Sequence, residues 1–187
     1  MSIILASSSP RRRELLTMLG LDFTVRPADI DEHFDPARDP ADEVLRVASA
    51  KAAAVPAAEN ELVLAADTIV VLDGRVLGKP KNGPDAARML RALSGRTHTV
   101  YTGVAAKRGG RRAGLVDRSD VTFREITDDE IARYIATGEP MDKAGSYGAQ
   151  GIGAIFVEKI DGDFYNVMGL PLCALGGLLG QFGEKIL

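Results

Sequence analysis

Three consecutive arginines, Arg11–Arg13, follow a serine-rich segment, Ser7–Pro10, near the start of the sequence. The apolar run before the serines predicts a strand, and Ser9 followed by Pro10 predicts a helix that begins at the arginines. Cations are disfavoured in the first turn of a helix by roughly 0.3–1 kcal/mol each, so something should compensate them. A phosphate chain would do so through backbone amides, guanidinium groups and serine hydroxyls, including that of Ser9. A solvated basic turn is the alternative interpretation.

A carboxylate, Asp67, interrupts an apolar stretch that predicts a strand. Burying an ionised carboxylate is costly, so we expect Asp67 to face a cleft, to bind a metal or to act as a base. A bulge or an edge position is the alternative, because the neighbouring Thr68 is also polar. Two other charged residues are less distinctive by themselves. Glu32 lies in an acidic stretch typical of a solvated turn, and Lys51 lies on an alanine-rich helix, where a surface lysine is common.

Two glycine-containing segments could bring the backbone close to a ligand. Lys79 stands between Gly78, which allows close approach, and Pro80, which fixes the chain, although a plain surface loop is the simpler interpretation. Residues 142–151 combine small residues with few polar side chains and follow no helical or strand period. A flat ligand could lie against such a backbone, and the amide of Gln150 could read the edge of a base. An ordinary glycine-rich loop is the alternative.

The cysteine and histidine content excludes two kinds of site. The chain has one cysteine and two histidines, whereas disulfides need pairs and a Cys/His zinc site needs three or four close ligands. Any metal would therefore be held by oxygen. Cys173, on an apolar C-terminal helix, is expected in the core, and His98, which has no obvious partner, is given no role.

Length and composition favour a single domain over residues 1–187. The apolar fraction of 45%, the charged fraction of 26% and the net charge of -3 argue against disorder and against a general nucleic-acid-binding surface. No apolar run approaches the about 20 residues of a membrane span, and the chain begins with apolar residues before basic ones, the reverse of a secretory signal. We therefore expect a cytoplasmic protein without a membrane or nucleic-acid partner.

Strands and helices alternate along the sequence without a linker or a repeat, which predicts one α/β unit with a mixed sheet. The dipeptide Asp73-Gly74 predicts the turn of a hairpin, and Thr127 with Glu130 predicts a capping box. The predicted strands are residues 2–6, the hairpin 61–77, residues 97–106 and 114–124, and two short strands around Ile155 and Phe164. The predicted helices are residues 11–19, 41–58, 84–94 and 126–138, and a last helix from about Pro171.

Six short motifs are spread over nearly the whole chain. They are residues 5–16 (LASSSPRRRELL), 66–68 (ADT), 78–80 (GKP), Ser94-Gly95 before His98, 142–151 (DKAGSYGAQG), and 162–171 (GDFYNVMGLP). In this order they resemble the Maf family of nucleoside triphosphate pyrophosphatases. Six spaced matches are far more specific than any single one.

The resemblance implies a mixed α/β fold in which an elongated sheet is flanked by helices and two lobes surround a nucleotide-binding cleft. Members of the family cleave nucleoside triphosphates between the α and β phosphates, need a divalent cation and form homodimers. Carboxylate oxygens suit Mg²⁺ or Mn²⁺ better than zinc, and Asp67 and Glu32 are the expected ligands.

The same resemblance assigns roles to single residues. Asp67 matches the catalytic residue that accepts a proton from the attacking water. Arg12 and its neighbour Arg11 match phosphate-facing arginines, and Lys51 and Lys79 match polar positions that line the same cleft. Together these side chains would supply the base and the positive charge that triphosphate hydrolysis requires.

Two positions separate the branches of the family. Thr68 and Gln150, with Arg12, match the branch that acts on dTTP and UTP. The branch that acts on 7-methyl-GTP has Asp-Gln and a glutamate at the corresponding places. A pyrophosphatase that removes unwanted pyrimidine nucleotides is therefore expected. Two alternatives stay open: a pyrophosphatase for purine or methylated purine nucleotides, and a non-catalytic nucleotide binder that affects septum formation in cell division.

Overall fold

The computed structural model describes residues 2–35 and 37–187. Its strands are β1 (Ile3–Leu5), β2 (Phe23–Val25), β3 (Leu62–Leu72), β4 (Arg75–Leu77), β5 (Thr97–Arg108), β6 (Arg111–Phe123) and β7 (Val157–Asp161). Its α-helices are α1 (Pro10–Met18), α2 (Pro40–Ala54), α3 (Gly83–Leu93), α4 (Asp128–Ala136), α5 (Phe164–Met168) and α6 (Leu172–Gln181). Three short 3-10 helices precede β7: η1 (Glu139–Asp142), η2 (Ala144–Ser146) and η3 (Ile152–Phe156).

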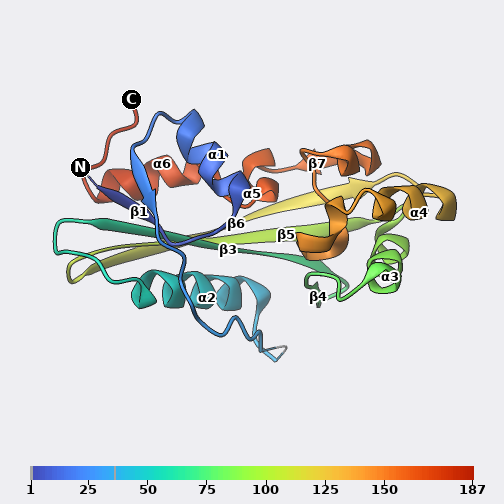
Figure 1. Ribbon diagram of the computed structural model, residues 1–187, viewed down its shortest axis with the longest axis horizontal. Coiled ribbons are helices and arrows are strands. Elements are labelled where there is room, and N and C mark those ends of the chain that lie inside the picture. Colours follow the sequence, from blue (N-terminus) through green and yellow to red (C-terminus); the bar gives the residue numbers. More distant parts are fainter. Residues whose placement is uncertain (1, 36) are drawn as a thin grey trace. The chain divides into compact units, whose positions relative to one another are not determined.

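The strands of the described residues form one mixed sheet with helices packed on it (Figure 1). Its order is β2-β1-β3-β5-β6-β7, with β4 paired to β3. β1 is parallel to both β2 and β3, whereas β3 and β4, and β6 and β7, are antiparallel. The predicted α/β class with a mixed sheet is confirmed.

The chain divides into two compact units, in agreement with the two lobes that the resemblance implied. Unit 1 comprises Met1–Asp67, Thr102–Asp117 and Gly169–Leu187, and unit 2 comprises Thr68–Tyr101 and Arg118–Met168. The division falls inside β3, and β5 and β6 also contribute residues to both units. None of the helices seen in the described residues is long and apolar enough to cross a membrane.

Unit 1 buries β1 on both of its faces. Ile4 packs against Ala48 of α2, and by strand alternation the buried Leu5 points to the opposite face, where α1 and α6 lie in Figure 1. Gly103 of β5 lets α2 lie close to the sheet, because a Cβ at this position would be 2.7 Å from the carbonyl oxygen of Val44.

Local signals set the helix ends of unit 1. α1 begins as predicted, with Ser9 as its N-cap, and is followed by Gly20, whose φ of 68° suits glycine. α2 begins after its own N-cap, Asp39. It ends at Ala54, within the predicted range of 41–58 and just before Pro56, which was expected to mark its end. The residue before a proline favours an extended conformation, as Val55 has here.

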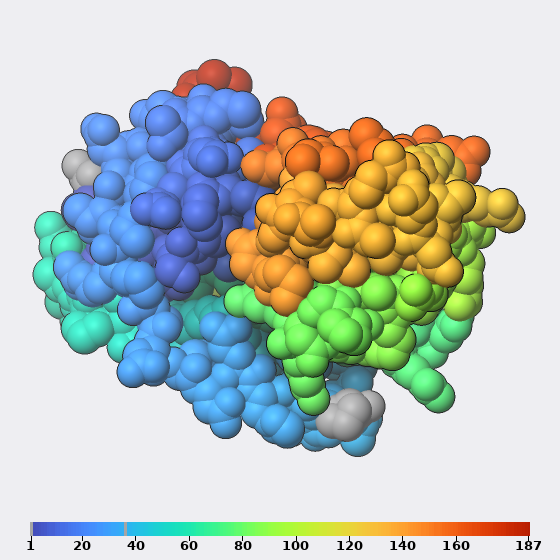
Figure 2. Space-filling view, turned by 45° about the vertical axis from the view of Figure 1, so that its right-hand side comes forward, coloured from blue at the N-terminus to red at the C-terminus, as the bar shows by residue number. Residues whose placement is uncertain are grey.

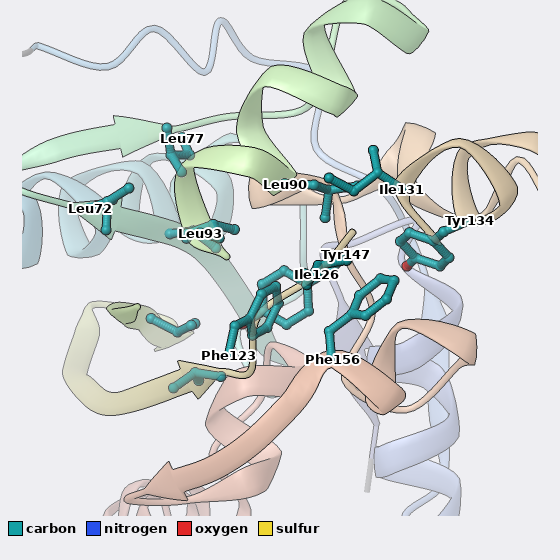
Figure 3. Packing of buried hydrophobic residues seen from close by; sticks show 13 residues of the cluster. Leu72, Leu77, Leu90, Leu93, Phe123, Ile126, Ile131, Tyr134, Tyr147 and Phe156 are labelled. Carbon is teal, nitrogen blue, oxygen red and sulfur yellow. The ribbon is translucent and has the colours of Figure 1, made fainter. Parts of the chain in front are cut away.

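Unit 2 has an aromatic core (Figure 3). The ring centroid of Phe123 lies 4.7 Å from that of Tyr147 and 6.1 Å from that of Phe156, and Tyr134 meets Phe156 edge to face at 5.1 Å. Aliphatic side chains complete the cluster, among them Leu72, Leu77, Leu90, Leu93, Ile126 and Ile131. Such aromatic pairs add roughly 0.5–1.5 kcal/mol each beyond their buried area. Tyr147 therefore anchors the segment 142–151 to the core.

His98 belongs to this core, although the sequence suggested no partner for it. Its Nε2 lies 2.8 Å from the hydroxyl oxygen of Tyr147, and its ring meets Phe123 edge to face. Its Nδ1 is buried without a hydrogen-bond partner in the described part of the chain. Burial lowers the pKa of His98 from 6.5 to about 4, although the negative charge of Asp120 partly opposes the shift.

Unfolding should therefore become easier as the pH falls through the range between these two pKa values. The unfolded chain binds a proton at His98 near pH 6.5 and the folded chain only near pH 4, so the free energy of unfolding falls by about 1.4 kcal/mol per pH unit in this window. Denaturant titrations between about pH 7.5 and pH 5 should show a loss of roughly 2 kcal/mol that is absent in His98→Gln. The control His33→Gln removes an exposed imidazole and should keep the slope. An equal slope in His98→Gln would contradict this expectation.

The chain after η3 differs from the prediction of two strands around Ile155 and Phe164. Ile155 lies in η3, a single strand (β7) follows it, and Phe164 begins the helix α5. The chain turns at Gly162, which has a φ of 126°, and the carboxylate of Asp163 then accepts a hydrogen bond from the backbone of Tyr165 at 2.7 Å. This capping contact favours a helical turn over a strand.

Two further expectations need correction. The turn between β5 and β6 is limited to Gly109 and Gly110, so the two strands extend beyond the predicted bounds of 97–106 and 114–124. At the end of β5, Arg108 donates to the carbonyl oxygen of Phe182 at 2.7 Å. Cys173 is exposed. The buried stripe of α6 includes Leu175, and a residue two positions earlier on a helix points away from that stripe.

Candidate active site

Lys51 of α2 joins two acidic side chains of unit 1. Its Nζ lies 2.7 Å from Oδ1 of Asp67 and 2.9 Å from Oε1 of Glu32, which is on the segment before α2. The side chains of Lys51 and Asp67 are 8% and 13% exposed, whereas that of Glu32 is 53% exposed. Lys51 is therefore not the ordinary surface lysine that its helix suggested, since burial of an ammonium group requires such pairing.

The fold places this lysine and its carboxylate by simple means. Lys51 lies in the last turn of α2, where the negative end of the helix dipole favours a cation. The helix packs on the sheet through small residues such as Ala48 and Ala52, so the lysine side chain reaches β3. Asp67 lies in the middle of β3, between the residues that pair with β1 (Leu62–Leu64) and those that pair with β4 (Val70–Leu72).

Arg12 directs its guanidinium group into unit 1. Its Nε donates to the carbonyl oxygen of Gly169 at 2.8 Å, and its Nη1 donates to Oγ of Ser7 at 3.1 Å. The same Ser7 oxygen accepts a hydrogen bond from the backbone N–H of Ser9 at 3.2 Å. The residue is only 9% exposed. These contacts stabilise the charge of Arg12 at the start of α1, where the helix dipole disfavours a cation.

The electrostatic surroundings of Arg12 include Asp67 and Glu32, the two carboxylates that pair with Lys51. Burial lowers the pKa of the Arg12 guanidinium, and Asp67 and Glu32 oppose this effect because their negative charges favour the protonated form. The positive charge of Arg11 lowers the pKa further. A guanidinium group stays protonated at neutral pH, so two buried cations, Arg12 and Lys51, lie within range of two carboxylates.

The start of α1 holds the other predicted residues of this segment. Ser9 is the N-cap, and its Oγ lies 3.5 Å from the backbone N of Arg12. Arg11 is half-buried and Arg13 is exposed. Dark blue atoms of the N-terminal part of the chain are visible at the surface in Figure 2. An anion that met this helix start would find a hydroxyl, backbone amides and guanidinium groups together.

Three further predicted residues, Thr68, Lys79 and Gln150, belong to unit 2. Thr68 in β3 is half-buried, whereas Lys79 and Gln150 are exposed. A backbone hydrogen bond of 3.1 Å from Gly145 N–H to the carbonyl of Gly78 joins the segment that carries Gln150 to the loop that carries Lys79. The structure thus connects two motifs of unit 2 that are distant in sequence.

The two expected metal ligands, Asp67 and Glu32, lie together in unit 1. Asp67 and Glu32 contact the same Lys51 nitrogen, so their oxygens are close together. No group of three or more His, Cys, Asp or Glu side chains that could hold an ion occurs among residues 2–35 and 37–187. Two carboxylates suit Mg²⁺ or Mn²⁺, because such ions are commonly completed by water and substrate phosphates.

Two contributors to the site are not singled out by sequence reasoning. The Ser7 hydroxyl and the Gly169 carbonyl hold the guanidinium of Arg12. Ser7 stands in a run of three serines in which nothing distinguishes one hydroxyl from another, and a backbone carbonyl carries no signal of its own. Their places inside the motifs 5–16 and 162–171 are the only hint the sequence offers.

Comparison with known proteins gives consistent matches over the chain. A model of the family described as Maf-like protein matches residues 2–182. The dTTP/UTP pyrophosphatase of Moorella thermoacetica is 56% identical over 187 residues, which cover 98% of this chain and 96% of that protein. The dTTP/UTP pyrophosphatase of Anaeromyxobacter dehalogenans strain 2CP-C is 53% identical over 185 residues, which cover 97% and 94%.

A solved structure is similar in fold. A HAM1 protein from Coxiella burnetii aligns with a TM-score of 0.50 at 16% identity, over 97% of this chain and 99% of that chain. At this identity the likeness concerns the fold alone.

Proposed function

The chain belongs to the Maf family, as its six motifs indicated, and we propose that it hydrolyses dTTP and UTP to nucleoside monophosphates and pyrophosphate. One observation carries the proposal: relatives named dTTP/UTP pyrophosphatase share 56% and 53% of aligned residues with it over nearly its whole length. In this role the protein removes unwanted pyrimidine nucleotides from the cellular pool.

The charged cluster of unit 1 supports the hydrolytic step. Water attacks phosphorus, the bond between the α and β phosphates breaks, and the proton of the water passes to a base. Asp67 is that base, and Lys51 orients it through the 2.7 Å contact. Arg12 and Arg11 bind phosphate oxygens and neutralise the charge that develops on the departing pyrophosphate.

A divalent cation, Mg²⁺ or Mn²⁺, completes the proposal. The residues that would hold it are Asp67 and Glu32, because both present carboxylate oxygens near the same point. When bound, the ion neutralises phosphate charge and polarises the phosphoryl group. Lys51 keeps the two carboxylates in place.

The base is read, in this proposal, by Thr68 and Gln150. A hydroxyl group and a primary amide can each both donate and accept, which suits the mixed donor and acceptor edge of thymine and uracil. A wrong base would leave the polar groups of Thr68 and Gln150 without matching partners once the bound nucleotide covers them, and that penalty can produce large discrimination.

A substrate panel tests this function. Pyrophosphate release is measured with Mg²⁺ or Mn²⁺ for dTTP, UTP, CTP, ITP and 7-methyl-GTP, and dTTP and UTP are expected to have the highest kcat/KM. No release from any pyrimidine triphosphate would overturn the proposal. A preference for ITP or 7-methyl-GTP would assign the chain to purine nucleotides instead.

A further inference from the structure

In unit 2, a short segment of chain wraps around the carboxylate of Glu139. Oε2 of Glu139 accepts a hydrogen bond from the backbone N–H of Ile152 at 2.8 Å, and Oε1 accepts one from Gly153 at 3.1 Å. Oε1 also accepts from the hydroxyl of Tyr134 at 2.9 Å, and that hydroxyl accepts from the backbone N–H of Gly148 at 3.1 Å. Two side chains thus hold three backbone amides.

The glycines of this segment lie against the same two side chains. A Cβ on Gly151 would be 2.5 Å from both carboxylate oxygens of Glu139, and one on Gly153 would be 2.6 Å from the Tyr134 hydroxyl. A Cβ on Gly148 would meet Oε1 of Glu139 at 3.2 Å. The small residues that sequence reasoning linked to a flat ligand therefore also serve to let the backbone approach a carboxylate.

The earlier part of the segment is fixed by other contacts. Gly145 bonds to the carbonyl of Gly78, Ser146 is fully buried with its Oγ 3.1 Å from the sulfur of Met89, and Tyr147 packs in the aromatic core. The chain emerges from the core after this point, since residues 150–152 are exposed. Figure 2 shows gold and orange atoms of this part of unit 2 at the surface.

Gln150 lies between the amides that Glu139 and Tyr134 hold. It is exposed, and the described hydrogen bonds to Gly148 on one side and to Ile152 on the other fix the backbone that carries it. Holding both flanks of a loop residue in this way limits the positions that its side chain can reach, which is how a supporting shell positions a functional group.

We propose that Glu139 is a positioning residue for substrate selection: its carboxylate holds residues 148–153 in one conformation and so sets the discrimination between bases that Gln150 exerts. The inference rests on the proposed function, in which Gln150 reads the base. In this proposal Glu139 acts through the backbone that it holds and not through contact with the nucleotide.

The ionisation of Glu139 agrees with this role. Burial alone would raise its pKa, but the hydrogen bonds from Ile152, Gly153 and Tyr134, together with the positive charge of Lys143, lower the pKa overall. An ionised carboxylate offers only acceptors, and all of its partners named here are donors. Glutamine at this position would place an N–H group toward at least one of these donors, which breaks that contact.

A double-mutant cycle tests whether Glu139 acts through Gln150. In Glu139→Gln, the ratio of kcat/KM for dTTP to that for ITP should fall roughly tenfold, the value of one good hydrogen bond. In a Gln150→Ala background the same substitution should change the ratio by less than about twofold, because the reader is already absent. An equal fall in both backgrounds would overturn the proposal, as would an unchanged ratio in Glu139→Gln.

A structural control separates positioning from general destabilisation. Glu130→Gln is the same chemical change in the same unit, where Glu130 caps α4 and pairs with Arg124 at 2.7 Å. It should lower the melting temperature and leave the dTTP to ITP ratio unchanged. If Glu139→Gln fails to fold, Tyr134→Phe serves in its place in the same cycle, because it keeps the ring in the core and removes only the hydroxyl contacts. A ratio unchanged by Tyr134→Phe would then overturn the proposal.

Hydrogen exchange without nucleotide keeps this inference distinct from the proposed function. The amides of Ile152 and Gly153 should exchange at least about tenfold faster in Glu139→Gln than in the unmodified protein, and no faster in Glu130→Gln. Unchanged exchange in Glu139→Gln would refute the positioning role even in an active enzyme. A chain that shows this exchange pattern but releases no pyrophosphate would refute the proposed function alone.

Discussion

Asp67→Asn is expected to lower kcat for pyrophosphate release from dTTP by roughly 10²–10⁴-fold, the usual contribution of a general base. The amide cannot take the proton of the attacking water, although its oxygen can still accept a hydrogen bond from Lys51, which keeps its 2.9 Å contact with Glu32. The fold should therefore persist. Steady-state kinetics, thermal melting and direct titration with dTTP measure the three quantities, and binding of dTTP should survive.

The matched control for this experiment is Asp73→Asn. Asp73 follows the same strand, pairs with Arg96 at 2.7 Å in an exposed position and has a φ of 51°, which asparagine tolerates. An exposed pair of this kind adds about 1 kcal/mol or less to the free energy of unfolding, so the fold should persist. Because Asp73 has no role in the proposed site, kcat should stay within about twofold. Asp67→Asn with an unchanged kcat would remove Asp67 from the role of base. A division phenotype that survives in the inactive variant would favour the alternative of a nucleotide-binding regulator.

The sequence predicts features that a few neighbouring residues determine. Ser9 caps α1 as expected, the turn at Asp73 and Gly74 closes the β3–β4 hairpin, and Thr127 with Glu130 forms the capping box of α4. In each case the interacting groups lie within four residues of one another, so the signal is present in a single stretch of chain.

Burial of polar side chains could not be predicted in the same way. Lys51 can be buried because it forms an ion pair with Asp67, which lies on another element. Arg12 can be buried because it donates to the carbonyl oxygen of Gly169, a residue 157 positions further along the chain. Glu139 gives no signal at all, since its partners are mainly backbone amides. The free energy of such contacts depends on where the fold brings distant groups, and residue types report it only through a family pattern.

Misplaced elements near the C-terminal end have a related cause. A helix of five residues, Phe164–Met168, cannot show a helical period, and its start depends on the φ of Gly162 and on the capping carboxylate of Asp163. Aromatic and β-branched residues favour strands when propensity alone is considered. Here a single capping contact decides the conformation instead.

Arg12→Lys is expected to lower kcat/KM for dTTP by roughly 10- to 100-fold, the value of a charge-assisted hydrogen bond, although it conserves the charge. Arg12 meets Gly169 through Nε and Ser7 through Nη1, and a flexible ammonium group cannot reproduce that planar fork. In the proposed site the same fork binds phosphate, so a lysine that satisfies the carbonyl loses the geometry needed for the substrate.

The same substitution should also cost stability, because the two roles of Arg12 share one side chain. If the buried carbonyl of Gly169 loses its donor, the free energy of unfolding should fall by about 1–3 kcal/mol, measured by denaturant titration. Arg13→Lys, at the exposed next position, is the control and should change neither quantity. Full activity in Arg12→Lys would mean that charge alone suffices at this position. A loss of stability with unchanged kcat/KM would make Arg12 a residue of the fold and leave phosphate binding to Arg11 and the helix start.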